Sequence, residues 1–211
     1  MLESFQKNKV YIAVGIIWLF HISALIGTNF AGIDWFIEKT PLNLSLCLIL
    51  FIMAYPIDRF VPILLFFILF LGGMFAEWLG VKYGILFGTY TYGNNFGFKI
   101  DGVPLLIGTY WAILTFATKS ISEYVKISSR LKIILAAVLM VLLDYFMEQN
   151  APRFDFWAFE GNSAPLKNYI TWFFLAILFQ ILLRFYDVKG NRFFCLNLYM
   201  AQLAFFIYFT L

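Results

Sequence analysis

The feature that most constrains the fold is a series of apolar runs, each close in length to a membrane crossing. A helix needs about 20 mostly apolar residues to span the hydrocarbon core of a bilayer. Seven runs approach this length: residues 10–27, 42–57, 60–79, 104–118, 131–148, 168–185 and 193–211. Several of them are short, so six or eight crossings also fit the pattern.

The composition favours lipid as the solvent for much of the surface. Hydrophobic residues make up 63% of the 211 residues, and charged residues only 13%. Soluble domains are nearer half apolar and about a quarter charged. Inside a bilayer the backbone must pair its own polar groups, which apolar runs of this length achieve as helices. We therefore predict an all-α fold, a polytopic membrane helix bundle of about seven transmembrane helices that forms a single domain over residues 1–211.

The distribution of Lys and Arg predicts the orientation, because cytoplasmic loops carry an excess of both. With seven crossings, one side holds ten: Lys7, Lys9, Arg59, Lys119, Lys126, Arg130, Lys132, Arg184, Lys189 and Arg192. The other side holds five: Lys39, Lys82, Lys99, Arg153 and Lys167. We expect the first side, and with it the N-terminus, to be cytoplasmic. The net charge of +3 gives no case for nucleic-acid binding.

The segments between the runs are uneven. Residues 119–132 read as a polar linker, and Pro104 is predicted at the first helical position, where its missing N–H is harmless. The stretch that follows Glu77 is too broken by glycines for a span and too apolar for an ordinary loop. We expect a non-helical or re-entrant segment near residues 81–103.

Chain direction brings the unusual polar residues to one membrane face. The first, third and fifth runs cross in the same direction, so His21, Glu77, Asp144 and Glu148 fall toward the same side. The irregular segment near residues 81–103 emerges there too. This convergence predicts an active site between helices.

Glu77, Asp144 and Glu148 are the candidate catalytic residues. An ionisable side chain at membrane depth costs about 2.5–3.5 kcal/mol on insertion scales and usually faces a cavity or a partner. Such surroundings favour a protonated carboxyl group, which can act as a general acid near neutral pH. Asp144 and Glu148 lie four residues apart and share a helix face, where repulsion favours one of them keeping a proton. Alternatively, these acids lie at helix ends and reach water.

Other side chains near these acids are candidates for substrate binding, each with a structural alternative. The candidates are Tyr83, Tyr90, Tyr92, Trp157, Asn168, Trp172 and His21. Aromatic ring faces can stabilise a positive charge, but the same residues suit an interfacial aromatic belt, which we favour for Tyr83. Asn168 would also fit as a helix N-cap, and His21 as a partner in an interhelical hydrogen bond.

Several classes of membrane protein lack their essential residues in this chain. One His cannot supply the ligands of a di-iron hydroxylase or desaturase. Residues 193–211 contain no Lys for a retinal Schiff base. No paired-Asp motif for magnesium diphosphate and no phosphate loop is present. Cys47 and Cys195 read as buried small hydrophobes rather than a disulfide. We expect no metal and no cofactor.

Two blocks of residues, taken in order, resemble the integral-membrane carotenoid hydratase family, whose members include gamma-carotene hydratase and bisanhydrobacterioruberin hydratase. The first reads Glu77-x-x-Gly80-x-x-x-Gly84-x-x-Phe87-Gly88-x-Tyr90-x-Tyr92, followed by Pro104-Leu105 and Trp111. The second reads Asp144-x-x-x-Glu148, then Trp157, then Pro165-Leu-x-Asn168-Tyr-x-x-Trp172. The chain departs from the pattern at Leu86 and Gln149, where Pro is expected, and at Thr171, where Gly is usual.

The resemblance implies a cofactor-independent hydro-lyase of carotenoid biosynthesis. It would add water across the terminal isoprene double bond of a ψ-end carotenoid such as gamma-carotene or lycopene. Asp144 would be the acid and Glu77 or Glu148 the base, with Phe87 joining the substrate-binding residues. The implied partners are the carotenoid, membrane lipid and other carotenoid-pathway enzymes, and the implied location is the cell (inner) membrane of a prokaryote. The alternative is a non-enzymatic membrane carotenoid- or lipid-binding protein or a small transporter.

Overall fold

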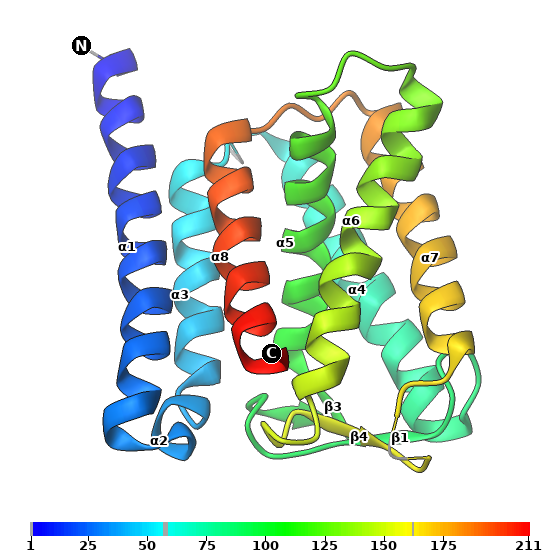
Figure 1. Ribbon diagram of the computed structural model, residues 1–211. Helices are drawn as coiled ribbons and strands as arrows, with labels where there is room; N and C mark the ends of the chain where they lie inside the picture. The colour runs from blue at the N-terminus through cyan, green and yellow to red at the C-terminus, as the bar shows by residue number, and fades with distance from the viewer. Residues whose placement is uncertain (1, 57–58, 162) are drawn as a thin grey trace.

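The chain folds into a bundle of long helices, as the apolar runs predict (Figure 1). The computed structural model describes residues 2–56, 59–161 and 163–211. The helices in this part of the chain are α1 (Leu2–Ala31), α2 (Ile33–Ile37), α3 (Thr40–Ala54), α4 (Phe60–Tyr83), α5 (Leu105–Ser122), α6 (Ser129–Asn150), α7 (Leu166–Phe185) and α8 (Arg192–Thr210). All but α2 are 15 residues long or longer.

Five of the seven expected crossings have the length and apolarity of a membrane span. Within the described residues, these are Lys7–Phe30, Ile33–Ala54, Phe60–Tyr83, Leu166–Phe185 and Arg192–Thr210. The expected spans at α5 and α6 are not among them. Helix α5 lies at the centre of the bundle, packed against α3, α4, α6, α7 and α8, and nearly all of it is buried. Its burial against protein allows it to carry polar residues that lipid would not tolerate.

Several predicted boundaries move in the structure. Pro104 is the N-cap of α5 and not its first residue. The polar linker predicted at residues 119–132 shrinks to 123–128, because α5 continues to Ser122 and α6 begins at Ser129. Lys119 is buried inside α5, where its ammonium group donates to the Val188 carbonyl. Residues 57 and 58, where the run predicted over residues 42–57 ends, lie outside the described residues.

The segment that follows α4 is non-helical, as expected, but it contains strands. Helix α4 ends at Tyr83 because Gly84 takes the left-handed conformation, with φ 62°. Strand β1 (Tyr90–Tyr92) pairs antiparallel with β4 (Trp157–Phe159), and β2 (Lys99–Ile100) pairs with β3 (Val103–Pro104). Figure 1 shows these strands as a layer beneath one end of the bundle. The all-α expectation therefore misses a small β layer.

Helix direction agrees with the prediction from the sequence. Helices α1, α4 and α6 all run toward the β layer in Figure 1. The carboxyl-terminal parts of these helices, which carry the unusual polar residues, therefore lie at one end of the molecule. Cys47 and Cys195 are buried and free, as expected.

Candidate functional site

Three carboxyl groups meet at one small cavity just inside the β layer. Glu77 comes from α4, while Asp144 and Glu148 come from α6. The remaining lining residues are Phe87, Tyr90, Tyr92, Ile107, Trp157, Phe159, Asn168 and Trp172. The cavity measures about 10 Å³. That volume suits about one water molecule.

Glu77 accepts hydrogen bonds on both carboxyl oxygens. The hydroxyl groups of Tyr90 and Tyr92 donate to its Oε2 at 2.5 Å and 2.8 Å, and Trp111 Nε1 donates to its Oε1 at 2.8 Å. The side chain is only 4% exposed. These three donors explain how an acid remains in an otherwise apolar helix, because buried polar groups are costly unless they are hydrogen-bonded.

Two glycines of α4, one on each side of Glu77, make room for these donors. A Cβ at Gly73 would lie 2.7 Å from Trp111 Cβ, and a Cβ at Gly80 would lie 2.7 Å from the Tyr90 hydroxyl oxygen. Any larger residue would push the indole or the phenol away from the carboxyl group. Both glycines are therefore needed for the hydrogen bonding of Glu77.

Asp144 and Glu148 lie one turn apart on α6 and share a single amide donor. Asn168 Nδ2 lies 3.2 Å from Asp144 Oδ2 and 3.0 Å from Glu148 Oε1. Trp157 Nε1 donates to Glu148 Oε2 at 2.8 Å. Asp144 Oδ1 accepts no hydrogen bond from the described residues, so Asp144 is the least saturated of the three acids. Asn168 is not an N-cap, because that position is Pro165.

The pairing of β1 with β4 connects the two halves of the site. In its register Tyr90 faces Phe159 and Tyr92 faces Trp157. Since alternate residues of a strand point to one side, all four rings face the cavity, while Thr91 and Ala158 are exposed. The strand pair thus supplies donors to Glu77 and to Glu148 from the same face.

The electrostatics of the site are unusual because, in the described part of the chain, no Lys or Arg forms an ion pair with Glu77, Asp144 or Glu148. Burial, and then the charge of Glu77, raise the pKa of both Tyr90 and Tyr92 well above 10. The two phenols therefore stay protonated and remain donors at neutral pH.

Aromatic rings form most of the remaining wall. The indoles of Trp111 and Trp172 stack with ring centroids 3.6 Å apart and planes 13° apart. Phe87 lies beside Trp172, at a centroid distance of 6.5 Å. This stack connects α5 to α7 and fixes the indole that donates to Glu77. The wall offers ring faces, whose negative potential attracts a positive charge.

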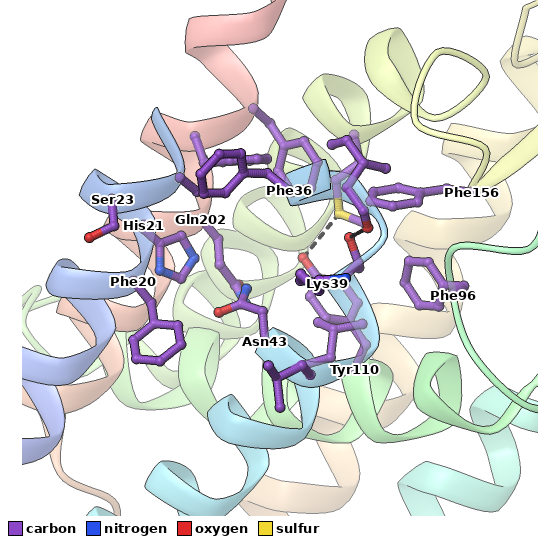
Figure 2. A pocket seen from close by; sticks show the side chains of 18 of the residues that line it. Phe20, His21, Ser23, Phe36, Lys39, Asn43, Phe96, Tyr110, Phe156 and Gln202 are labelled. Carbon is purple, nitrogen blue, oxygen red and sulfur yellow. Dashed lines mark hydrogen bonds between the residues drawn. The ribbon is translucent and has the colours of Figure 1, made fainter. Parts of the chain in front are cut away.

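Two of the residues proposed from the sequence do not reach this cavity. Tyr83 is 64% exposed and packs on Trp78, away from the acids. His21 lines a second, larger cavity of about 410 Å³ between α1, α3 and α8 (Figure 2). The interhelical hydrogen bond expected for His21 is wrong, because its Nδ1 bonds to the Ile17 carbonyl within α1 at 2.8 Å. The other nine candidates all line the small cavity.

Sequence reasoning missed Trp111, Ile107 and Phe159 as residues of the site. Trp111 stands in the resemblance pattern, but nothing near it in sequence indicates a bond to Glu77. For Phe159 a signal was present, since the alternation Trp157-Ala-Phe159 matches that of Tyr90-Thr-Tyr92 and has the period of a strand.

Two departures from the resemblance pattern contact each other. Thr171 Oγ1 donates to the Leu86 carbonyl oxygen at 2.7 Å. Leu86 has a φ of 66°. Proline is confined to φ near −65° and cannot adopt this conformation. The local backbone therefore requires a residue other than proline at position 86.

In the part of the chain that the structure describes, no group of three or more His, Cys, Asp or Glu residues is arranged to hold a metal ion.

Comparison with known proteins gives one match. No curated protein and no solved structure matches the chain. A family model described as carotenoid biosynthesis protein matches residues 42–210, a range that includes every residue lining the small cavity. The chain therefore belongs to the carotenoid biosynthesis protein family.

Proposed function

We propose that the protein is a carotenoid hydratase that acts on the terminal isoprene double bond of a ψ-end carotenoid. The observation that carries this proposal is a cavity for about one water molecule, surrounded by three acids that pair with no Lys or Arg of the described residues. Hydration of an alkene needs a proton donor, a water molecule and a base. The reaction is redox-neutral and all three requirements can be met by side chains, so the proposal includes no cofactor.

Asp144 is the proton donor in this proposal. Its Oδ1 has no hydrogen-bond partner among the described residues, whereas both oxygens of Glu77 and of Glu148 accept bonds. Two carboxyl groups that share one amide repel each other when both are ionised, and this favours one retained proton. Asp144 is the better placed of the pair to give that proton away.

The reaction then runs in two steps. Asp144 protonates the CH carbon of the terminal double bond, and the electron pair of that bond forms the new C–H bond. The dimethyl carbon becomes a tertiary cation, facing the rings of Tyr90, Tyr92 and Trp172. Water attacks this carbon, Glu148 or Glu77 takes the proton that water loses, and the product is a tertiary alcohol. Return of this proton from the base to Asp144 restores the acid. From Glu148 the proton can return within the pair joined by Asn168, and from Glu77 it can return through a water molecule in the cavity.

The membrane location suits a substrate of this kind. A polyene partitions into lipid, and an enzyme in the bilayer can receive it sideways. We propose that residues 1–211 form one transmembrane domain with seven crossings and a cytoplasmic N-terminus, in the cell membrane of a prokaryote. Its partners would be the carotenoid, the surrounding lipid and other enzymes of the pathway.

Pigment analysis tests the proposal directly. The chain is expressed in cells that make gamma-carotene or lycopene, and the extracted pigments are examined for a product heavier by one water. We expect this product with the natural chain and none with Asp144→Asn. The matched control is Asp187→Asn, because the Asp187 side chain is 81% exposed. Unchanged pigment in the presence of folded natural chain would refute the hydratase.

One observation favours a second function, namely binding of a carotenoid or lipid without chemistry. The larger cavity of about 410 Å³ falls within the range of small-molecule sites, about 300–1,000 Å³. A binding protein would retain pigment through purification in a fixed ratio without changing its mass. Replacement of Asp144 would then leave pigment content unaltered.

A further inference from the structure

The larger cavity opens between α1, α2, α3 and α8, and its walls are mainly apolar (Figure 2). Its rim is formed by side chains that project outward from helices long enough to span a membrane. Among them Leu42 is 62% exposed, Trp35 55% and Phe20 41%. Because α1 and α3 belong to candidate spans, this rim would face lipid. An apolar molecule dissolved in the bilayer can therefore reach the cavity without crossing water.

Three buried or half-buried polar side chains, His21, Gln202 and Asn43, line this apolar space with hydrogen-bonding atoms that no described residue pairs. The Nδ1–H of His21 donates to the Ile17 carbonyl, so the neutral ring leaves an unused lone pair on Nε2. The amide groups of Gln202 and Asn43 make no side-chain hydrogen bond to the described residues. His21 is 5% exposed and Gln202 7%. Figure 2 shows all three on the same side of the cavity, away from Phe96 and Phe156.

These polar atoms have no hydrogen-bond partner among the described residues, so a ligand or a water molecule in the cavity would pair them, as native proteins pair nearly all such groups. The group that fits is a hydroxyl, which can donate to His21 Nε2 and accept from the amide of Gln202 or Asn43. A pure hydrocarbon would leave all three unpaired. The chemistry of the cavity thus describes a long apolar molecule with one hydroxyl group.

The larger cavity borders the site of the three acids. Tyr110 and Met147 line it, and the Tyr110 hydroxyl donates to Met147 Sδ at 3.0 Å. Met147 lies between Asp144 and Glu148 in the sequence of α6, so the larger cavity reaches the helix that carries two of the acids. Since Met147 directly precedes Glu148, its contact with Tyr110 lies on the side of the larger cavity that is nearer the acids. One extended molecule can therefore occupy the larger cavity while its end lies beyond Tyr110 and Met147.

We propose that the larger cavity binds the body of an isoprenoid that already bears a hydroxyl group, and that His21, Gln202 and Asn43 recognise that hydroxyl. This inference rests on the proposed function for the identity of the reaction, but binding itself does not depend on it. It places the protein after a step that introduces a hydroxyl group into the same polyene.

The test measures binding of two probes, lycopene and a monohydroxylated lycopene, by quenching of tryptophan fluorescence in detergent micelles. All proteins carry Asp144→Asn, so that no probe is converted. We expect the hydroxylated probe to bind about tenfold more tightly, as one or two hydrogen bonds predict. Gln202→Leu and His21→Phe should each remove most of this preference while lycopene binding stays unchanged. Ser23→Ala, at the exposed rim of the same cavity, is the matched control.

Unchanged lycopene binding shows that a variant is folded. Should Gln202→Leu fail to fold, Asn43→Leu tests the same preference at a half-buried position. Equal binding of the two probes to the parent protein, or equal losses for both probes in the variants, would overturn the inference. Undiminished quenching in Trp35→Phe would place the probe elsewhere and would also overturn it. If the probes discriminate as expected but pigment in living cells is never hydrated, the proposed function fails and the binding site remains.

Discussion

The Glu77 carboxyl group permits a prediction whose size follows from its hydrogen bonds. Tyr90 and Tyr92 both donate to the same oxygen, Oε2, at 2.5 Å and 2.8 Å. A hydrogen bond to a charged group contributes about 1.5–3 kcal/mol net. Tyr92→Phe or Tyr90→Phe leaves one phenol on that oxygen, so we expect each to destabilise the fold by about 1.5 kcal/mol, at the lower end of this range.

The double replacement should cost more than the sum of the two single ones. It leaves Oε2 of a buried carboxyl group with no phenol donor, so that only the Trp111 hydrogen bond to Oε1 still compensates the burial of that group. We expect a coupling of at least about 0.5 kcal/mol between the two tyrosines, since neighbours that share a partner are not additive. For a chain of this size 1 kcal/mol corresponds to about 2–4 °C in the melting temperature. Each single change should therefore lower it by about 3–6 °C.

Thermal unfolding in detergent micelles measures these shifts, and product formation in membranes measures activity. Tyr83→Phe is the matched control, because this tyrosine is 64% exposed and its hydroxyl bonds to none of the described residues. Shifts in Tyr90→Phe and Tyr92→Phe no larger than that of the control would refute the reasoning. A double variant that merely adds the two single effects would refute the shared-oxygen argument alone.

Three further predictions concern other parts of the structure. Burial and the charge of Glu77 raise the pKa of Tyr90 and Tyr92. Absorbance titration of the native protein should therefore show neither phenol ionising by about pH 10, the usual pKa of tyrosine, and both should ionise there once the protein is unfolded. Gly93→Ala should unfold the β layer, since a Cβ there would lie 2.3 Å from the Asp155 carbonyl oxygen. The control is Gly15→Ala, whose Cβ would lie in open space; in thermal unfolding it should be neutral or stabilise the fold by up to about 1 kcal/mol. Burial of Glu123 opposes ionisation, but hydrogen bonds from Lys132 and Arg184 outweigh it and hold the pKa of this carboxyl group below the usual 4.5. The ionised Glu123 should therefore stabilise the fold fully above about pH 4.5, and this contribution should be lost as the pH falls through the lowered pKa. In the melting assay this pH dependence should be missing in Glu123→Gln.

Much of the helical framework was predictable because a bilayer crossing demands a long apolar run. The runs at residues 60–79 and 168–185 differ from α4 and α7 by four residues or fewer at each end. The sequence was a weaker guide to which of these helices would be exposed to lipid. Helix α5 reads as a span, yet its neighbours are other helices and its polar face is turned to them. A single sequence does not reveal which apolar helix others will surround.

The candidate site was predictable to the extent that it depends on helix direction. Glu77 and Asp144 were expected at one face since their helices run the same way, and both line the small cavity. The contacts that hold the acids were not predictable in the same way. The pairing of Tyr92 with Trp157 joins residues 65 positions apart, and the bond from Trp111 to Glu77 joins two helices. Such contacts depend on the packed geometry, which no local pattern specifies.

The order of donors and acids along the chain has a consequence for membrane insertion. Among the described residues, each side chain that donates a hydrogen bond to one of the three buried acids lies after that acid in the sequence. Tyr90, Tyr92 and Trp111 follow Glu77, while Trp157 and Asn168 follow Asp144 and Glu148. During synthesis from the N-terminus, α4 therefore emerges with an acid that only α5 and the β1 segment can satisfy. Helix α6 in turn depends on α7. Each acid-bearing helix should thus be retained at the insertion machinery until its successor arrives, so that the bundle enters lipid as helix pairs, α4 with α5 and α6 with α7.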